Sequence, residues 1–378
     1  MTRQNDATRS NRRRFLAGSA AIGAVTLAGC TNLVGDGGGE SDETAGSTVG
    51  QIGSGREDRD APGGTPVAEM PDLEGELTIY SGRGEILVGE LISFLDDTYP
   101  DFEPIVRYNS GSDLVNQILS EGAGTPADVF YTVDSGGLGA LADEGRTQEL
   151  SSELTDIVRE EFHTDSWTGT SGRARSIPFN TDAYSESEIP SDIMEFPDFE
   201  GDLGWAPSYP SCQGFVTAMR QLTDDETTRE WLEGMVDAGI QAYDDELRVS
   251  QAVADGELDA GFANHYYIQR VLAGSPDAPI ETAFTEGDAG SIFDVAGAAV
   301  IDEADDPDLA ENFIRHLLSA EAQEYFAVET YEYPLIPDVD PVGGLPTINE
   351  LDVPDLRLAE LSDVQATIDL MREVGIET

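Results

Sequence analysis

Residues 77–97 have the sequence LTIYSGRGEILVGELISFLDD, and this stretch decides the fold class. The first five residues predict a strand. The segment 85–97 then predicts a helix, because Val88, Leu91, Ile92 and Leu95 recur with helical spacing on one face. The polar turn SGRG joins the two. A strand that leads through a short turn into a helix is the first half of a βαβ unit.

The same alternation continues on both sides of the chain's middle. Further strands are predicted at 105–108, 127–133, 203–206 and 258–263. Helices are predicted at about 112–121, with Ser112 as a cap, and at 138–144, 214–222, 227–238 and from Pro307 onward. We therefore predict an α/β protein of two lobes, each a mostly parallel sheet flanked by helices.

The chain length suits two domains. We expect lobe 1 to comprise residues 75–172 and 286–378, and lobe 2 to be inserted as residues 173–285. Two crossing segments, near 173–181 and 281–286, would form the hinge. Residues 30–74 are rich in Gly, Ser, Thr, Asp and Glu and poor in apolar residues, so we expect a disordered linker there.

The first 30 residues have the composition of an export signal. NRRRFL at 11–16 carries a twin-arginine pattern, and the apolar run behind it is shorter than the ~20 residues that a membrane-spanning helix needs. LAGC at 27–30 resembles a lipobox, so we expect residues 1–29 to be removed and Cys30 to carry a lipid. The predicted location is the outer face of the cell membrane. Cys212 then has no partner for a disulfide.

The charge of the chain is strongly acidic. Asp and Glu number 75 against 20 basic residues, all of them arginine, which gives a net charge of −55. Such a chain lacks the basic stripe that nucleic acids require, so we expect no nucleic acid as a partner. The carboxylates are spread along the whole sequence, which favours a solvated acidic surface adapted to concentrated salt and a halophilic source.

Sequence signatures of catalysis are missing. The three histidines are scattered, and the chain contains no HExxH, no G-x-S-x-G and no P-loop. No nucleophile is paired with a base, so we do not expect an enzyme. The tight turn at 136–139 is not a dinucleotide fingerprint.

Polar loops follow the predicted strands, at the edge where α/β sheets bind ligands. Helix amino termini at such loops also offer free N–H groups to an anion. The candidate ligand-binding residues of lobe 1 in these loops are Ser81, Gly82, Arg83, Ser112, Asp134 and Ser135. Those of lobe 2 are Ser211, Gln213, His265, Tyr266 and Tyr267. Together they predict one cleft between the lobes.

Five segments resemble the periplasmic ferric-ion-binding proteins of ABC importers. They are LTIYSGR at 77–83, SEGAGTPADVFYTVDSGGLGALA at 120–142, SGRARSIPFN at 171–180, FVTAMR at 215–220 and GELDAGFANHYY at 256–267. The resemblance runs from about residue 77 to the 330s, and TPADVFY and NHYY are its most specific parts. It implies the two-lobed periplasmic-binding-protein fold, here in a haloarchaeal lipoprotein.

In that family two adjacent tyrosinates bind Fe(III), and the resemblance assigns this role to Tyr266 and Tyr267. Phenolate is a hard oxygen donor, and its proton must leave when iron binds. Asp134 and His265 are possible further ligands. Carbonate or another synergistic anion would be held by Arg83 and the serine- and glycine-containing loops. Arg173 and Arg175 are possible anion contacts, although hinge salt bridges suit them better.

The chain departs from the family at three positions. Gly84, Val133 and Phe179 stand where relatives carry a histidine, a glutamate and a third tyrosine. The resemblance implies delivery of the ligand by a monomer to an ABC permease and its ATPase. Three alternatives stay open: the same fold binding an organic or oxyanion solute such as thiamine, a phosphonate or a polyamine; an extracellular enzyme; and a surface interaction module without a small ligand.

Overall fold

The computed structural model describes residues 49–53, 56, 59–356 and 364–378. The predicted signal at 1–29, the lipidation candidate Cys30 and the first part of the predicted linker lie outside these residues. The described residues all belong to one compact unit, 47–378.

Lobe 1 contains three parallel strands in the order β2-β1-β3. They are β1 (Gly75–Ser81), β2 (Phe102–Tyr108) and β3 (Val129–Thr132). The helices of this lobe are α1 (Glu85–Thr98), α2 (Gly111–Glu121), α3 (Ser135–Asp143), α4 (Ser152–Thr155), α9 (Pro307–His316) and α10 (Ala320–Val328). Strand β10 (Phe293–Val300) continues the sheet antiparallel to β3. The predicted βαβ units are therefore present, and the predicted α/β fold is confirmed.

Lobe 2 repeats the scheme with shorter strands. β5 (Leu203–Trp205) lies between β6 (Gln241–Ala242) and β7 (Ala260–Gly261), and both pairings are parallel. The remaining strands are β8 (Ala263–Asn264) and β9 (Ile280–Ala283), and the helices are α5 (Pro210–Leu222), α6 (Asp225–Asp237), α7 (Glu246–Ala254) and α8 (His265–Gly274). The predicted strand at 258–263 is thus divided into β7 and β8.

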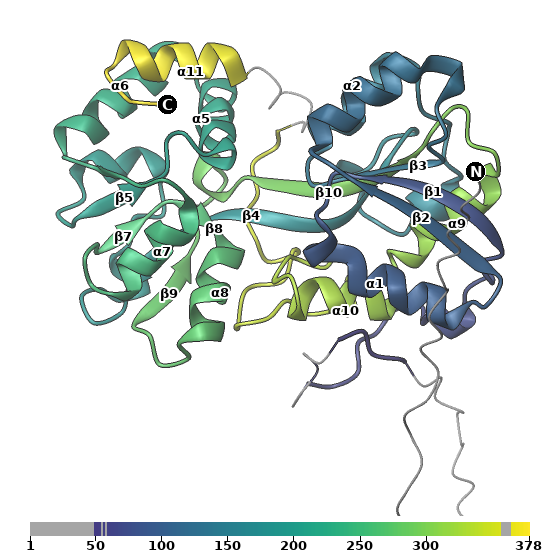
Figure 1. Cartoon of the computed structure of the whole chain (residues 1–378). Coiled ribbons are helices and arrows are strands. Elements are labelled where there is room, and N and C mark those ends of the chain that lie inside the picture. The colour runs from purple at the N-terminus through teal and green to yellow at the C-terminus, as the bar shows by residue number, and fades with distance from the viewer. Residues whose placement is uncertain (1–48, 54–55, 57–58, 357–363) are drawn as a thin grey trace, which may run out of the picture. The chain divides into compact units, whose positions relative to one another are not determined.

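The strand β4 (Thr168–Asn180) belongs to both lobes (Figure 1). Residues 168–174 pair with β10, and residues 175–180 pair with β7, β8 and β9. The pairing partner changes between Ala174 and Arg175. A second crossing leads back from β9 to β10. The parallel strands of each lobe are therefore joined through antiparallel crossing strands.

Each lobe has its own apolar core. The core of lobe 1 contains Leu77, Ile79, Leu91 and Phe313, so the helical face predicted from residues 85–97 is buried as expected. The core of lobe 2 includes Trp205, Phe215 and Trp231, whose rings pack edge to face. The two cores explain why the lobes can keep their internal structure independently of each other.

A third crossing, which the sequence did not predict, returns the chain to lobe 2. Leu351 and Val353 pack on the core of lobe 1, whereas Leu356 packs on that of lobe 2. Helix α11 (Val364–Glu373) then buries Leu370 and Met371 in lobe 2. The prediction that residues 286–378 all belong to lobe 1 is therefore wrong for the last segment, and the hinge has three crossings where two were predicted.

The described part of the predicted linker is ordered against lobe 1. Ile52, Val67 and Leu73 are buried in its core, and residues 67–69 form a short 3-10 helix. The Glu321 carboxylate of α10 accepts the backbone N–H groups of Gly50 (2.8 Å) and Val67 (2.9 Å). The expectation of disorder up to residue 74 is thus wrong for this part, because a few spaced apolar side chains and two hydrogen bonds to Glu321 dock it.

Two helices begin earlier than predicted, at Gly111 and at Ser135. Ser110, rather than Ser112, caps α2 by accepting the N–H of Asp113. Asp134 caps α3 by accepting the N–H of Gly137 at 3.1 Å. Asp134 is thereby fixed at the start of α3, at the edge where β3 ends.

Candidate functional site

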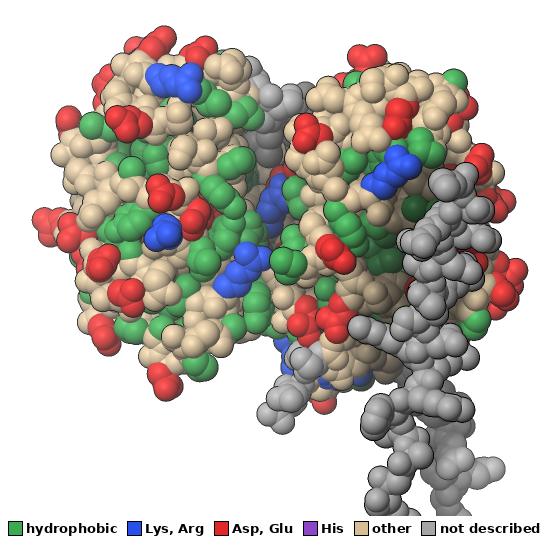
Figure 2. Space-filling view, viewed as in Figure 1, with side chains coloured by type: hydrophobic (Ala, Val, Ile, Leu, Met, Phe, Trp, Pro, Cys, Tyr) green, Lys and Arg blue, Asp and Glu red, His purple; other side chains and the backbone are tan. Residues whose placement is uncertain are grey.

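A cavity of about 660 Å³ lies between the lobes. Lobe 1 contributes Val133, Asp134, Ser135 and Glu332 to its wall. Lobe 2 contributes Tyr209, Ser211, Asn264, Tyr266, Tyr267 and Arg270. Arg173 and Asp294, on the crossing strands β4 and β10, also line it. Figure 2 shows acidic side chains spread over both lobes and arginine side chains along the groove between them.

Three tyrosines from two helix starts meet in this cavity. Tyr266 and Tyr267 lie in the first turn of α8, with ring centroids 4.4 Å apart. The Oη atoms of Tyr209 and Tyr267 are 2.6 Å apart, within hydrogen-bond distance. Tyr209 directly precedes α5, whose first residue is Pro210. The cavity therefore presents three clustered phenol groups, where the sequence predicted two.

Two of the phenols have raised pKa values. Burial raises the pKa of Tyr266 above its ordinary value. Burial, and then the neighbouring Tyr266, raise the pKa of Tyr267 as well, so both groups keep their protons at neutral pH when no ligand is bound. The side-chain amide of Asn264 donates to Tyr266 Oη at 3.2 Å, and this hydrogen bond helps to fix the position of that oxygen. A ligand that takes these oxygens as phenolates must bring enough positive charge to release their protons.

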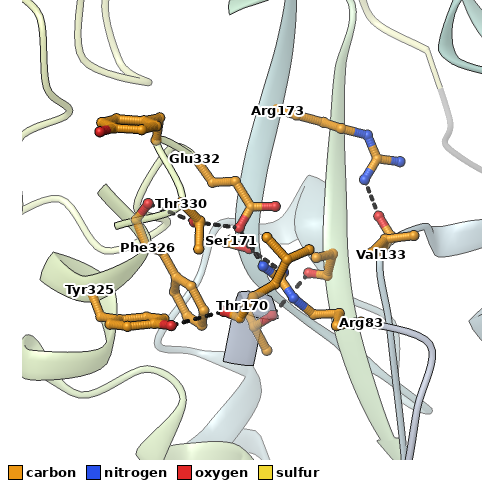
Figure 3. Close-up of polar contacts among 12 residues, drawn as sticks. Arg83, Val133, Thr170, Ser171, Arg173, Tyr325, Phe326, Thr330 and Glu332 are labelled. Atoms are coloured by element: carbon orange, nitrogen blue, oxygen red, sulfur yellow. Dashed lines mark hydrogen bonds and ion pairs between the residues drawn. The ribbon is translucent and has the colours of Figure 1, made fainter. Parts of the chain in front are cut away.

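Two arginines flank the phenols. The Arg270 guanidinium lies over the rings of Tyr266 and Tyr267, 5.0 Å and 5.4 Å from their centroids. Among the described residues it has no carboxylate within ion-pair distance. Arg173 instead donates to the Val133 carbonyl, as Figure 3 shows, and pairs with Asp294. Arg270 is therefore the cation of the cavity wall that is available to an anion.

Arg83, predicted as an anion contact, is a buried structural ion pair. Its guanidinium is fully buried and donates to Ser171 and to the Glu332 carboxylate (Figure 3). Burial alone would raise the pKa of Glu332, but Arg83 and hydrogen bonds from Thr330 and Ser171 outweigh it and lower that pKa. Ser81 is equally buried and donates to the Arg83 carbonyl. Neither side chain lines the cavity, so the prediction for both is wrong.

His265, predicted as a possible metal ligand, has both ring nitrogens engaged by backbone. The Ala174 N–H donates to Nδ1 at 3.2 Å, which assigns the proton to Nε2, and Nε2–H donates to the Tyr331 carbonyl at 2.8 Å. Tyr331 has a φ of 61°, the only positive value among the described residues other than glycine. Burial lowers the pKa of His265 to about 4. His265 thus connects α8 to lobe 1 as a neutral hinge contact.

Three more candidates lie away from the cavity wall. Ser112 is exposed and lies near Ser110. Gln213 points its amide at the Pro207 carbonyl, 3.4 Å away. At Gly82 an added Cβ would lie 2.9 Å from Thr132 Oγ1 and 3.0 Å from Gly111 Cα, so its role is close packing of two loops. Asp134, Ser135, Ser211, Tyr266 and Tyr267 are the predicted residues that the structure brings together.

The departures from the family pattern are also explained locally. Phe179 is buried in the core of lobe 2, and its side chain has no oxygen to bind a metal. Val133 lines the cavity but contributes only its carbonyl, which Arg173 already occupies. Gly84 faces open space, since a Cβ added there would meet no atom of the described chain within 4 Å. No group of three or more His, Cys, Asp or Glu side chains arranged for a metal ion occurs within the described residues.

Comparison with known proteins gives the same family from sequence and from structure. Residues 97–348 match the model of the bacterial extracellular solute-binding proteins. The chain belongs to this family. No helix in the described part of the chain combines the length and apolar character needed to span a membrane.

Individual relatives of this solute-binding protein extend the likeness over most of the chain. It is 26% identical to the major ferric iron-binding protein of Neisseria meningitidis over 322 residues, which covers 82% of the chain and 96% of the relative. It is 31% identical to iron uptake protein A2 of Synechocystis over 284 residues, which covers 70% and 82%.

Solved structures show the same two-lobed fold. Iron-bound HitA from Pseudomonas aeruginosa is similar with a TM-score of 0.70 and 28% identity, over 80% of this chain and 99% of that one. FutA from Trichodesmium, in complex with iron and citrate, is similar with a TM-score of 0.71 and 25% identity, over 80% and 100%. The predicted periplasmic-binding-protein fold is therefore confirmed.

Proposed function

We propose that this protein captures ferric ion in the cavity between its lobes and delivers it to an ABC permease. The observation that carries the proposal is the cluster of Tyr209, Tyr266 and Tyr267, whose phenol groups converge on one cavity. Phenolates are hard oxygen donors, and a trivalent cation supplies the charge that displaces their protons. The naming of several relatives as iron-binding supports the same cargo.

Lobe 1 supplies carboxylates opposite the phenols. Asp134 and Glu332 face the same cavity, although Asp134 also caps α3 and Glu332 pairs with Arg83. Asp134 is the better candidate for an additional iron ligand, because its second oxygen has no hydrogen-bond partner among the described residues that would have to be given up. Iron held first by the lobe 2 phenols would thus meet Asp134 as the lobes close.

An anion would share the cavity with iron. Arg270 replaces Arg83 as its proposed partner, because Arg270 lies on the cavity wall beside the phenols and Arg83 is buried in an ion pair. Carbonate and citrate both present the planar carboxylate geometry that a guanidinium binds in a bidentate manner. The citrate in the similar Trichodesmium structure supports a small carboxylate there.

The test is a titration of the metal-free protein with ferric nitrilotriacetate, followed by visible absorption. Iron on phenolates gives a charge-transfer band, which we expect for the wild type and expect to weaken and shift in Tyr266→Phe and in Tyr267→Phe. Tyr184→Phe is the matched control, since this lobe 2 tyrosine packs on Phe199 outside the cavity. A wild-type protein that binds no iron but binds a phosphonate or thiamine in the same cavity would favour the organic-solute alternative.

We also propose that the mature protein is held at the outer face of the cell membrane by a lipid on Cys30 and acts there as a monomer. The order of twin arginines, short apolar run and LAGC supports this processing. Mass spectrometry of the native protein tests it: a diacylglycerol-modified or otherwise lipidated peptide starting at Cys30 is expected, and an unmodified peptide spanning residue 30 would contradict it.

A further inference from the structure

A buried carboxylate lies directly behind the phenol cluster. Glu246, the first residue of α7, is fully buried. Its Oε1 accepts from Arg175 on β4 and from the Ser211 hydroxyl on α5, and its Oε2 accepts from the backbone N–H of Asn264 at 2.9 Å. One side chain therefore connects the crossing strand, the start of α5 and the start of α8.

The connected segments are those that carry the phenols. Tyr209 stands two residues before Ser211, and Tyr266 two residues after Asn264. Tyr209 and Tyr267 come from separate helices, yet their oxygens are 2.6 Å apart. Side chains at helix starts and loops hold such a spacing only when a rigid outer layer fixes their backbones. Glu246 reaches both segments at once.

Stability alone is a poor explanation for this carboxylate. The partner Arg175 is as deeply buried as Glu246, and its Nε and Nη2 atoms have no hydrogen-bond partner among the described residues. Buried ion pairs often stabilise a fold no better than apolar side chains of the same size, because both charges lose their water. An incompletely satisfied buried pair is better explained by a need for defined geometry.

We propose that Glu246 is the positioning residue of the phenol cluster: by bridging Ser211 and Asn264 it sets the distance between Tyr209 and the Tyr266–Tyr267 pair. The use of this spacing to the protein rests on the proposed ferric function. The distance between the phenol oxygens, however, is a property of the metal-free molecule. Arg175 supplies the opposite charge beside the carboxylate and ties it to β4.

The first test needs no metal. In Glu246→Gln the amide offers one accepting oxygen and one donating NH₂, so the NH₂ meets either the Asn264 N–H or the Arg175 guanidinium, donor against donor. We expect crystal structures of the metal-free proteins to show Tyr209 Oη and Tyr267 Oη within hydrogen-bond range in the wild type and beyond about 3.2 Å in the variant. An unchanged contact in the folded variant would overturn the proposal.

The second test measures iron. With ferric nitrilotriacetate as the probe, we expect Glu246→Gln to bind iron about 10–100-fold more weakly and with a shifted charge-transfer band, as for other outer-layer residues of metal sites. In a Tyr209→Phe background the same change should cost less, because the residue that it positions has already lost its hydroxyl. Equal losses in both backgrounds would assign Glu246 a general structural role.

Glu324→Gln is the matched control. Glu324 is also buried and paired with an arginine, Arg56, but it lies on α10 of lobe 1 away from the cavity. We expect it to lower the melting temperature without moving the iron band. If Glu246→Gln does not fold, Glu246→Asp keeps a charge for Arg175 but retracts the carboxylate, and both tests apply to it unchanged. A wild type without an iron band refutes the ferric function, while the metal-free comparison still decides the role of Glu246.

Discussion

Proton release is the residue-scale consequence of a phenol site. Because burial raises the pKa of Tyr266 and of Tyr267, each phenol is protonated at neutral pH and must lose its proton to bind iron. Ferric affinity should therefore rise with pH, by about one order of magnitude per pH unit for each phenolate formed. A pH-stat titration with ferric nitrilotriacetate measures the protons released.

Tyr209→Phe separates two phenolates from three. If Tyr209 is a ligand, this variant should release one proton fewer per iron than the wild type, and the pH dependence of affinity should become less steep by the same amount. Tyr184→Phe should release the wild-type number. An unchanged proton count in Tyr209→Phe would leave Tyr209 as a hydrogen-bond partner of Tyr267 rather than a ligand.

The hinge histidine predicts a pH dependence of stability. Burial lowers the pKa of His265 from 6.5 to about 4, so between these values the unfolded chain binds a proton that the folded protein does not. Stability is therefore complete above about pH 6.5 and falls as the pH falls toward 4, by about 3 kcal/mol from this residue. Urea unfolding at a series of pH values between 4 and 6.5 measures this effect. The free energy of unfolding should depend less steeply on pH in His265→Gln than in the wild type.

His163→Gln is the control for that experiment, because this half-buried histidine pairs with Thr168 at the start of β4 and makes no hinge contact. The comparison separates the loss of the hinge histidine from the loss of a histidine elsewhere. Some slope should remain in His265→Gln, since burial also lowers the pKa of His316. A His265→Gln protein with the full wild-type slope would show that His265 is already protonated in the folded state.

The sequence indicated where the ligand site lies better than it indicated what each residue does there. Tyr266 and Tyr267 were found because GELDAGFANHYY at 256–267 resembles a family in which two adjacent tyrosines bind iron. Tyr209 was missed because its partner, Tyr267, is 58 residues away and nothing local marks it. Arg83 was misassigned because a loop arginine looks the same whether it faces a ligand or a buried carboxylate such as Glu332.

At the scale of elements, the docking of residues 49–53 and 59–74 on lobe 1 makes a testable contribution to stability. Glu321 accepts two backbone N–H groups of this segment in a buried setting. Glu321→Gln replaces one acceptor by a donor, which should cost roughly 1–3 kcal/mol because a buried N–H loses its partner. Urea unfolding measures the loss. As a control, substitution of the exposed Glu303 by Gln should change the free energy of unfolding by less than about 0.5 kcal/mol. An equally small effect of Glu321→Gln would mean that this carboxylate does not hold the segment.

Elements near the hinge were the least predictable. The face of α1 followed from helical spacing, since a single periodic pattern fixes both the helix and its buried side. The apolar face of α11 is equally clear, but periodicity cannot tell which of two lobes covers it, and the answer depends on the third crossing near 354–355. β4 was expected only as a hinge connection. Its residues 171–176 pair with strands of both lobes, and no local sequence pattern distinguishes such a shared strand from a linker.

At the scale of the whole molecule, the three crossings explain how a cavity can be both defined and variable. β4 fixes the lobes side by side through hydrogen bonds on both halves, and His265 adds a contact from α8 to Tyr331 beside the tyrosines. The cavity wall is thus divided between two independently packed cores, so a change of hinge angle alters the distance from the phenols to Asp134 without unpacking either core.

The net charge of −55 sets the salt dependence of the molecule. Twenty arginines cannot pair with 75 carboxylates, so repulsion between acidic side chains opposes the compact state. Raising the salt from about 0.1 M to about 1 M shortens the Debye length from about 10 Å to about 3 Å, which removes most of this repulsion. The melting temperature should therefore rise steeply over this range in KCl.

The shape of that rise distinguishes screening from a general salting-out effect. Screening is nearly complete once the Debye length is as short as the spacing of surface charges, so the melting temperature should level off above about 1 M KCl. Salts that act by exclusion from apolar surface continue to stabilise in proportion to their concentration. A melting temperature that is flat between 0.1 M and 1 M would show that the carboxylates do not repel one another enough to matter, and would remove the physical basis for a halophilic origin.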